Sequence, residues 1–230
     1  MVVRKLIDLF KPKPNLAPRV FIVSFPRSGH HALVGFLNRV SDAADNYCEF
    51  YSCEKHNGEP IECPQKHVNW RVKRNCCGAG KTFLKNHDFD LRLPYRKEDK
   101  FVVQYRHPFL SIKSWYEMES GKGKKLEPWP KFFEQKLAFW EDFVRKWVLE
   151  LGDRDNVLPV TYDSLKDREV ILQIAEFSGA GIKPELDKFK PNFREKTRQL
   201  ESEREFFKER ERAIAPLLAQ VKIAPLFSDV

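Results

Sequence analysis

Residues 24–31, SFPRSGHH, combine small, basic and imidazole side chains between two apolar runs. A loop with glycine and a basic residue between a strand and a helix is suited to binding phosphate. The first N–H groups of the helix point outward and the helix dipole favours an anion. Arg27 would add a planar, bidentate donor, and Ser28, His30 and His31 could each donate from the side chain. Alternatively, Ser28 only caps the helix and the histidines only pack.

Metal chemistry fits this stretch less well. Two adjacent histidines at a helix start point about 100° apart, and no Asp or Glu lies beside them to complete a metal site. We therefore expect an anion at this loop and no metal ion in the site.

Further reactive side chains follow other apolar runs of the chain. Lys85 and His87 come after TFL, and Arg106 comes after KFVVQY. Ser114 lies eight residues beyond Arg106, and Tyr162 follows NVLPVT. Ligands of open α/β sheets bind at the carboxyl ends of the strands. If these runs are parallel strands, their ends would gather the side chains around one site, although each residue could also have an ordinary structural role.

Strand-like and helix-like patterns alternate along the chain, as a fold that positions such strand ends requires. The predicted strands cover residues 19–25, 81–87, 100–106 and 156–162. The predicted helices cover residues 29–40, 108–119, 129–151 and 164–177. Gly35, inside the first helix, could allow close packing on the sheet. This order predicts an α/β fold, a three-layer sandwich with a central, mostly parallel sheet.

Length and composition predict one folded domain over residues 1–230, because 42% of the residues are hydrophobic. Residues 1–18 are interpreted as an N-terminal tether and 194–230 as a charged, exposed helix and tail. The first segment lacks the apolar core of a signal peptide, so a cytoplasmic protein without stable membrane insertion is expected. The net charge of +8 favours an anionic partner. Nucleic acid is not expected, because the basic residues are dispersed.

Residues 41–80 form a predicted Cys-rich insertion that would border the acceptor side of the site. The segment holds all five cysteines, with two histidines among them: Cys48, Cys53, His56, Cys63, His67, Cys76 and Cys77. Free thiols, one or two disulfides, and a zinc site are all compatible with the irregular spacing.

The stretch NCCGAGKTF (75–83) imitates a Walker A loop, which binds nucleotide phosphates. Its first glycine position is Asn75, and the flanking residues read neither as a buried strand before it nor as a helix after it. We therefore do not expect a nucleotide-phosphate loop there, and this counts against the alternative of a kinase.

The first two strand ends resemble sulfotransferases that use 3′-phosphoadenosine 5′-phosphosulfate (PAPS). Their P-loop-like first loop commonly reads [FY]-P-[KR]-S-G-T-T and grips the 5′-phosphosulfate. Residues 25–31, which include Gly29, are similar to it, with His30 and His31 in place of the two threonines. Their catalytic histidine often lies in K-[TS]-H, and residues 85–87 match this motif with one change.

The later strand ends resemble the same family. In R-x-P-x(5)-S the Arg and Ser hold the 3′-phosphate, and Arg106, Pro108 and Ser114 have this spacing. Residues 160–166 are similar to the segment whose Tyr lies near the adenine, here Tyr162. Many members stack a Trp on the adenine where this chain has Ala32, and "NFREKTR" supplies Arg194 but no glycine for a late loop that clasps the 3′-phosphate. The ordered resemblance covers about residues 20–180.

The resemblance implies a PAPS-dependent sulfotransferase, with PAP as its product and without a metal. His87 would act as general base toward a hydroxyl or amine, Lys85 would stabilise the transferring group, and Arg27 would hold the 5′-phosphate and the leaving group. Asp88 could orient His87 or cap the following turn. The acceptor would be a small molecule or a glycan. A non-catalytic module that binds PAPS or another anion is the alternative.

Overall fold

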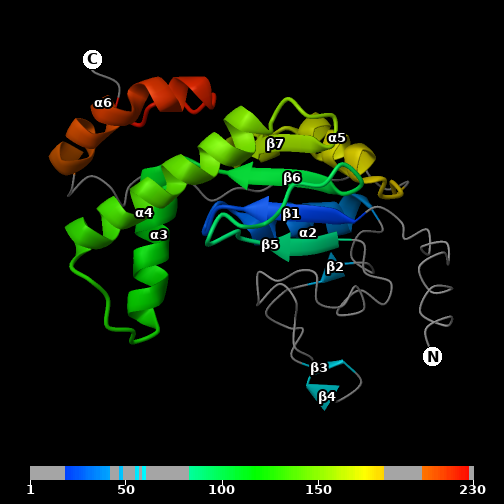
Figure 1. Ribbon diagram of the computed structural model, residues 1–230, viewed down its shortest axis with the longest axis horizontal. Coiled ribbons are helices and arrows are strands. Elements are labelled where there is room, and N and C mark those ends of the chain that lie inside the picture. The colour runs from blue at the N-terminus through cyan, green and yellow to red at the C-terminus, as the bar shows by residue number, and fades with distance from the viewer. Residues whose placement is uncertain are drawn as a thin grey trace, which may run out of the picture.

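The computed structural model describes residues 19–41, 47–48, 55–56, 59–60, 83–183 and 204–227. A five-stranded sheet with the order β2-β5-β1-β6-β7 lies at its centre (Figure 1). Its strands are β1 (Val20–Ser24), β2 (Tyr47–Cys48), β5 (Phe83–Asn86), β6 (Lys100–Tyr105) and β7 (Val157–Thr161). A separate antiparallel pair joins β3 (Lys55–His56) and β4 (Glu59–Pro60). All pairings in the larger sheet are parallel, so the predicted strands and the α/β class are confirmed.

The central strand β1 sets the edge at which the site forms. Its five residues are all buried, as expected for a strand covered on both faces. In the sheet register Ser24 pairs with Gln104 of β6, and Val23 pairs with Asn86 of β5. The carboxyl ends of three neighbouring strands therefore meet at one edge.

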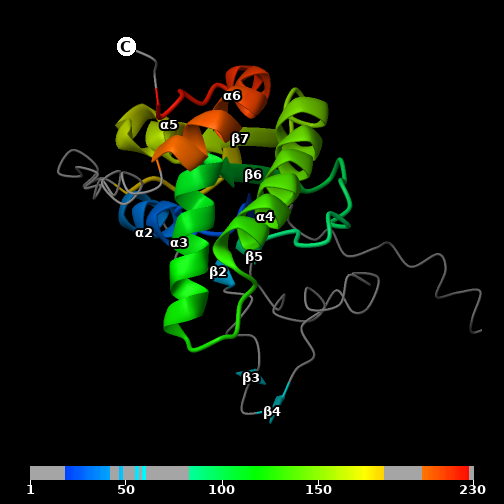
Figure 2. The same cartoon turned by 90° about the vertical axis from the view of Figure 1, so that its left-hand side faces the viewer.

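Helices cover both faces of the sheet, which confirms the predicted three layers (Figures 1 and 2). One face packs on α2 (His30–Val40) and α5 (Arg168–Ser178). The other packs on α3 (Pro108–Gly121), α4 (Trp129–Val144) and α6 (Arg204–Gln220). Alternate β1 residues belong to the two cores, because successive strand side chains point to opposite faces.

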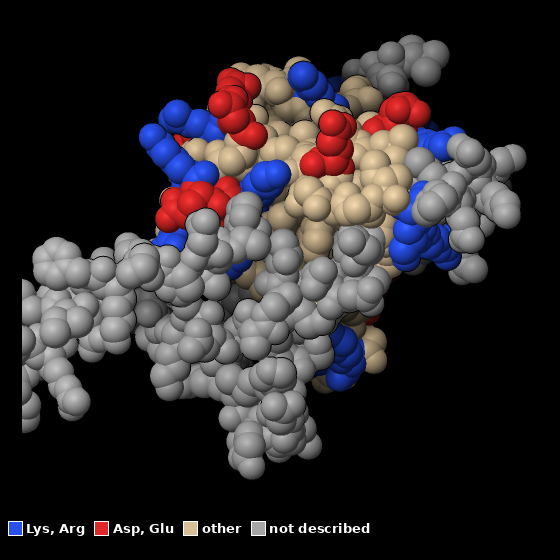
Figure 3. Space-filling view, turned by 90° about the vertical axis from the view of Figure 1, so that its right-hand side faces the viewer, with Lys and Arg blue, Asp and Glu red and all other residues tan. Residues whose placement is uncertain are grey.

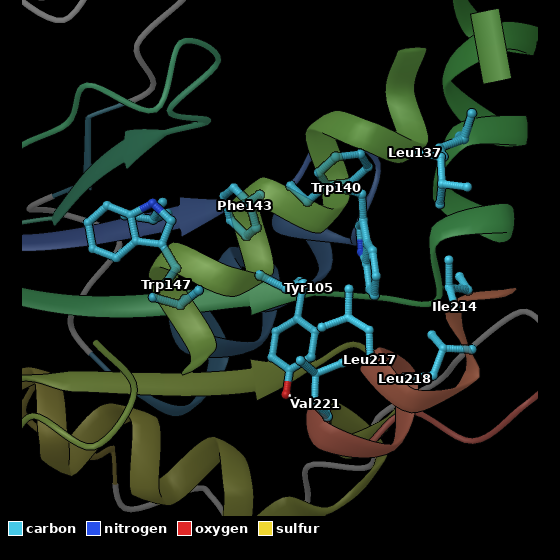
Figure 4. Close-up of a cluster of buried hydrophobic side chains, with 14 of the residues drawn as sticks. Tyr105, Leu137, Trp140, Phe143, Trp147, Ile214, Leu217, Leu218 and Val221 are labelled. Carbon is cyan, nitrogen blue, oxygen red and sulfur yellow. Dashed lines mark hydrogen bonds between the residues drawn. The ribbon is translucent and has the colours of Figure 1, made fainter. Parts of the chain in front are cut away.

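The predicted helix over 129–151 changes its form before it ends. The chain is α-helical to Val144 and then forms a π-helix, η3 (Arg145–Glu150), so an α-helix to residue 151 is wrong for the last turns. The predicted apolar face is buried nonetheless. Figure 4 shows Leu137, Trp140, Phe143 and Trp147 from this segment beside Tyr105 of β6 and the apolar side chains of α6.

The predicted helix over 164–177 is divided in two. Residues Asp163–Lys166 form a short 3₁₀ helix, η4, and α5 starts at Arg168. Asp167 separates them because its carboxylate accepts a hydrogen bond from Glu169 N at 2.9 Å and so caps α5.

The prediction of an exposed C-terminal helix is wrong for one of its faces. Besides its charged residues, α6 has an apolar stripe whose side chains are buried: Phe207, Ile214, Leu217 and Leu218. Glu211 is buried as well, and its carboxylate accepts hydrogen bonds from His107 and from the residues that follow the helix. Residues 194–203 lie outside the described residues.

The described residues on one face of the molecule include both basic and acidic side chains. On the face shown in Figure 3, basic and acidic side chains alternate around an uncharged area. None of the described helices has the length and apolar character needed to cross a membrane.

Candidate active site

The loop between β1 and α2 has the conformation expected of an anion-binding turn. Ser28 N donates to Phe25 O at 3.1 Å, and both Arg27 (φ 65°) and Gly29 (φ 90°) adopt left-handed backbone conformations. Gly29 is the residue at the cap position, and no side chain of the described residues caps α2. The interpretation of Ser28 as a helix cap is therefore wrong. The N–H groups of the first turn of α2 remain suited to a negatively charged ligand.

Glycine is required at position 29 by both conformation and space. A Cβ there would overlap the ring of Tyr162, which comes from the end of β7. Gln104 of β6 holds the same loop by donating from Nε2 to Ser28 O at 2.9 Å. Two strand ends thus fix the shape of the loop. At Gly35, by contrast, a Cβ would meet no atom of the described residues within 4 Å, so the predicted close packing on the sheet is wrong.

The two glycines of this region give a matched pair of substitutions. Gly29→Ala should lower the free energy of unfolding by about 2–4 kcal/mol, because a left-handed alanine and an overpacked contact are both costly. Gly35→Ala, inside the helix that Gly29 precedes, should raise it by about 0.5–1 kcal/mol, because alanine has the higher helix propensity. Urea unfolding measures both values. Equal effects of the two variants would contradict the described conformation of the loop.

Two arginines predicted to bind the cofactor lie near each other. Arg27 Nε donates to Ser114 Oγ at 3.1 Å. The residue predicted to bind the 5′-phosphate is therefore in direct contact with a residue predicted to bind the 3′-phosphate. The Arg106 guanidinium lies over the Tyr162 ring, 4.4 Å from its centroid. Burial lowers the pKa of Arg106, and the charge of Arg27 lowers it further, against the opposing effects of Tyr162 and Asp163. The paired positive charges favour an anionic ligand.

Two buried donors in this part of the site lack a partner among the described residues: Ser28 Oγ and Arg106 Nε. Buried polar groups are normally hydrogen-bonded. These donors lie close to the N-terminus of α2 and to the two arginines. Such a set of groups would suit a polyanion with several acceptor oxygens, for example a nucleotide with two phosphate groups.

His87 is held in one tautomer at the end of β5. Its Nδ1 lies 2.7 Å from Ser24 O and 3.1 Å from Ser24 Oγ. A carbonyl oxygen can only accept, so Nδ1 carries the proton and the lone pair of the neutral ring is on Nε2. This is the arrangement that a general base needs. Sequence reasoning missed the role of Ser24, which no motif indicates because the contact joins two strands.

His30 and Lys85 lie beside His87. Burial lowers the pKa of His30 to about 2, and Lys85, His87 and His31 lower it in addition. His30 is therefore neutral near pH 7, although its charge could not be predicted from the sequence. Lys85 is only 2% exposed and supplies a fixed cation close to the histidines. His31 is exposed, with its ring centroid 5.7 Å from that of His30.

Asp88 caps the turn after His87 and does not orient the histidine ring. Its Oδ2 accepts from Lys146 Nζ at 2.6 Å and from Trp147 Nε1 at 2.8 Å, and its Oδ1 accepts from Leu93 N at 2.6 Å. Both partners of Oδ2 belong to the π-helix η3. These two adjacent side chains of η3 thus hold the carboxylate of the residue next to His87.

Aromatic side chains lie next to the ring of His87. Phe89 is 51% exposed, and its ring centroid lies 5.2 Å from that of His87. Trp115 and Phe139 support it, with centroids 6.1 Å and 6.5 Å away. An acceptor that reaches Nε2 of His87 would therefore meet aromatic side chains near the base.

Some predicted residues lie outside the described residues. These are Arg194, four of the cysteines, residues 1–18, and the Walker-like stretch up to Thr82. Cys48 is described as part of β2. Within the described part of the chain, no group of three or more His, Cys, Asp or Glu side chains is placed to hold a metal ion.

Comparison with known proteins bears on the fold. No family model matches the chain, and no curated protein matches it in sequence. A sulfotransferase from Alicyclobacillus acidocaldarius matches its structure with a TM-score of 0.51 and 15% identity, over 90% of this chain and 97% of that one. The chain has a sulfotransferase fold. The fold predicted from the resemblance is thus confirmed.

Two further solved structures match the sulfotransferase fold of this chain over shorter regions. A retinol dehydratase in complex with retinol and PAP has a TM-score of 0.45 and 20% identity, over 75% of this chain and 64% of that one. The sulfotransferase domain from the curacin biosynthetic pathway has a TM-score of 0.45 and 16% identity, over 74% and 77%.

Proposed function

We propose that the chain is a sulfotransferase that transfers the sulfuryl group of PAPS to a hydroxyl or amine acceptor. The observation that carries the proposal is the hydrogen bond from His87 Nδ1 to the Ser24 carbonyl. It leaves the lone pair of His87 on Nε2, at the carboxyl ends of β1 and β5. The base lies beside a buried lysine and the start of α2, so proton abstraction and anion binding would occur in one place.

The donors around the first loop would hold PAPS. Arg27, Ser28 and Gly29, together with the N–H groups at the start of α2, would bind the 5′-phosphosulfate. Arg106 and Ser114 would bind the 3′-phosphate. The buried donors of Ser28 and Arg106 that lack partners among the described residues support this assignment. PAPS would supply the activated sulfuryl group.

Further predicted contacts complete the cofactor site. Tyr162 lies over Arg106 and against Gly29, which supports a position near the adenine. His31 at the start of α2 and Arg194 would add donors to the phosphate groups. A small molecule or a glycan would be the acceptor.

The residues around the base would share the remaining work. His87 Nε2 would accept the proton of the acceptor, as its tautomer allows. Lys85 and Arg27 would place positive charge where negative charge develops on the transferring group and the leaving phosphate. Such fixed cations would provide electrostatic stabilisation, which does most of the work in this kind of in-line displacement.

Calorimetric titration without magnesium tests the cofactor class. Adenosine 3′,5′-bisphosphate should bind more tightly than AMP or ATP. Arg106→Ala should weaken its binding about 10- to 100-fold, because a charged hydrogen bond is worth about 1.5–3 kcal/mol. Arg210→Ala is the matched control, since Arg210 pairs with the exposed Glu134 of α4 and is not among the proposed cofactor ligands. A preference for ATP would favour a kinase, and no binding of any nucleotide would exclude the proposal.

A further inference from the structure

A chain of hydrogen-bonded side chains leads from His87 to the edge of the sheet. His87 Nδ1 lies 3.1 Å from Ser24 Oγ, and Ser24 Oγ lies 3.1 Å from His30 Nδ1. His30 Nε2 then lies 2.6 Å from the hydroxyl of Tyr47. The groups belong to four elements, since Ser24 ends β1, His30 starts α2, Tyr47 belongs to β2 and His87 follows β5.

The carbonyl contact at one end fixes the direction of the first hydrogen bond. His87 Nδ1 carries a proton because it faces Ser24 O at 2.7 Å, and the same N–H can also reach Ser24 Oγ. The Ser24 hydroxyl can then donate to His30 Nδ1, and the neutral His30 can donate from Nε2 to Tyr47. In this arrangement the donors of His87, Ser24 and His30 each have an acceptor within this series of side chains. Every hydrogen bond points away from His87.

We propose that Ser24, His30 and Tyr47 are positioning residues that stabilise the positively charged ring of His87 during catalysis. The proposal rests on the proposed role of His87 as the base. When His87 Nε2 takes the proton, the acceptor O–H bond breaks, its electron pair stays on oxygen, and the ring becomes an imidazolium. Its Nδ1–H then donates more strongly to a chain of aligned dipoles, which polarise one another. No proton has to move along the chain.

The charges around this series of hydrogen bonds explain why His87 needs it. Lys85 of β5 is buried beside these histidines and lowers the pKa of His30, and a positive charge there would also oppose one on the neighbouring His87. A carboxylate would offset it, but the groups that face the ring of His30 are Lys85, His87, His31 and Tyr47. Because His30 is neutral, it can accept from Ser24 and donate to Tyr47 at once. This use of both ring nitrogens would leave neither of them for the cofactor contact predicted for its side chain.

Tyr47→Phe tests the proposal, with Tyr95→Phe as the matched control. Each variant removes one hydroxyl whose hydrogen bond measures 2.6 Å, but Tyr95 donates to Asn156, away from the site. The titration of the His87 ring is followed by NMR in the free protein. In Tyr47→Phe its midpoint should move to lower pH by about 0.3–1 unit, because a hydrogen bond that favours the charged ring is lost. Tyr95→Phe should leave the midpoint unchanged.

Turnover supplies the second readout. Tyr47→Phe should reduce kcat about 2- to 10-fold with little change in KM, and should move the acidic limb of the pH profile with the NMR midpoint. His30→Asn should act in the same way, because its amide oxygen can still accept from Ser24 but does not reach Tyr47. A change in stability alone would leave the acidic limb where it is.

Two results would overturn the proposal. One is an unchanged His87 titration in both Tyr47→Phe and His30→Asn. The other is a ring ¹⁵N spectrum in which neutral His30 carries its proton on Nδ1. The NMR readouts need neither PAPS nor an acceptor. A shifted midpoint in a protein without any turnover would therefore retain the hydrogen-bond chain and reject the proposed function.

Discussion

His87→Asn should lower turnover about 10²- to 10⁴-fold while the affinity for adenosine 3′,5′-bisphosphate stays nearly unchanged. Asparagine can keep a hydrogen bond to the Ser24 carbonyl, which His87 Nδ1 approaches to 2.7 Å, but it has no group at the position of Nε2. The substitution thus removes the base and preserves the contact that orients it. Transfer of labelled sulfate to an acceptor measures the rate, and calorimetry measures the affinity.

The outcomes separate an enzyme from a binding module. His87→Ala in the presence of added imidazole is the companion experiment, because free imidazole should restore part of the rate in the space that the ring leaves. Retention of turnover in His87→Asn would exclude His87 as the base. A wild-type protein that binds the bisphosphate but transfers sulfate to no acceptor would indicate the non-catalytic alternative.

Glu211→Ala should lower the free energy of unfolding by about 3–5 kcal/mol. Glu211 is 4% exposed and accepts from His107 Nε2 at 2.9 Å, Leu226 N at 2.7 Å and Phe227 N at 2.9 Å. Its removal leaves the buried His107 donor and two half-buried N–H groups without this acceptor, and an unsatisfied buried donor costs about 1–3 kcal/mol. Urea unfolding measures the loss, and Glu211→Gln, which keeps one acceptor oxygen, should lose less.

A matched control tests whether burial causes this effect. Glu134→Ala removes a carboxylate that pairs with Arg210 at 2.6 Å on the surface, and exposed pairs contribute only about 0–1 kcal/mol. Similar losses in the two alanine variants would contradict the buried network. Because His107 follows Arg106 directly, we also expect Glu211→Ala to weaken bisphosphate binding.

The pH dependence of the wild type should have the same origin. Burial raises the pKa of Glu211, but the hydrogen bonds from His107, Leu226 and Phe227 outweigh it and hold the pKa below its usual 4.5. Burial also holds the pKa of His107 below its usual 6.5. Both groups therefore stabilise the fold above these values and lose that contribution as the pH falls. The Glu211 part, below pH 4.5, should be missing in Glu211→Ala.

The sequence by itself determined the strand order along the chain and the fold class, and it indicated candidate site residues at the strand ends. The apolar runs of β1 and β6 and the helical spacing of α2 and α4 are local patterns, and local patterns report which face of an element is buried. Glycine and Arg27 after a strand indicated the anion loop for the same reason. These features depend on residues only a few positions apart.

Only the tertiary structure decided the chemistry of the individual groups. The tautomer of His87 depends on a carbonyl 63 residues away, and the neutral state of His30 depends on burial and on Lys85. Glu211 looked like one charge among many in an exposed helix, but it is buried against His107, 104 residues distant. Protonation and hydrogen-bond direction are set by the side chains that packing brings together from different elements. No spacing along one element encodes them, because the partners meet only when the sheet and its two helical layers have formed.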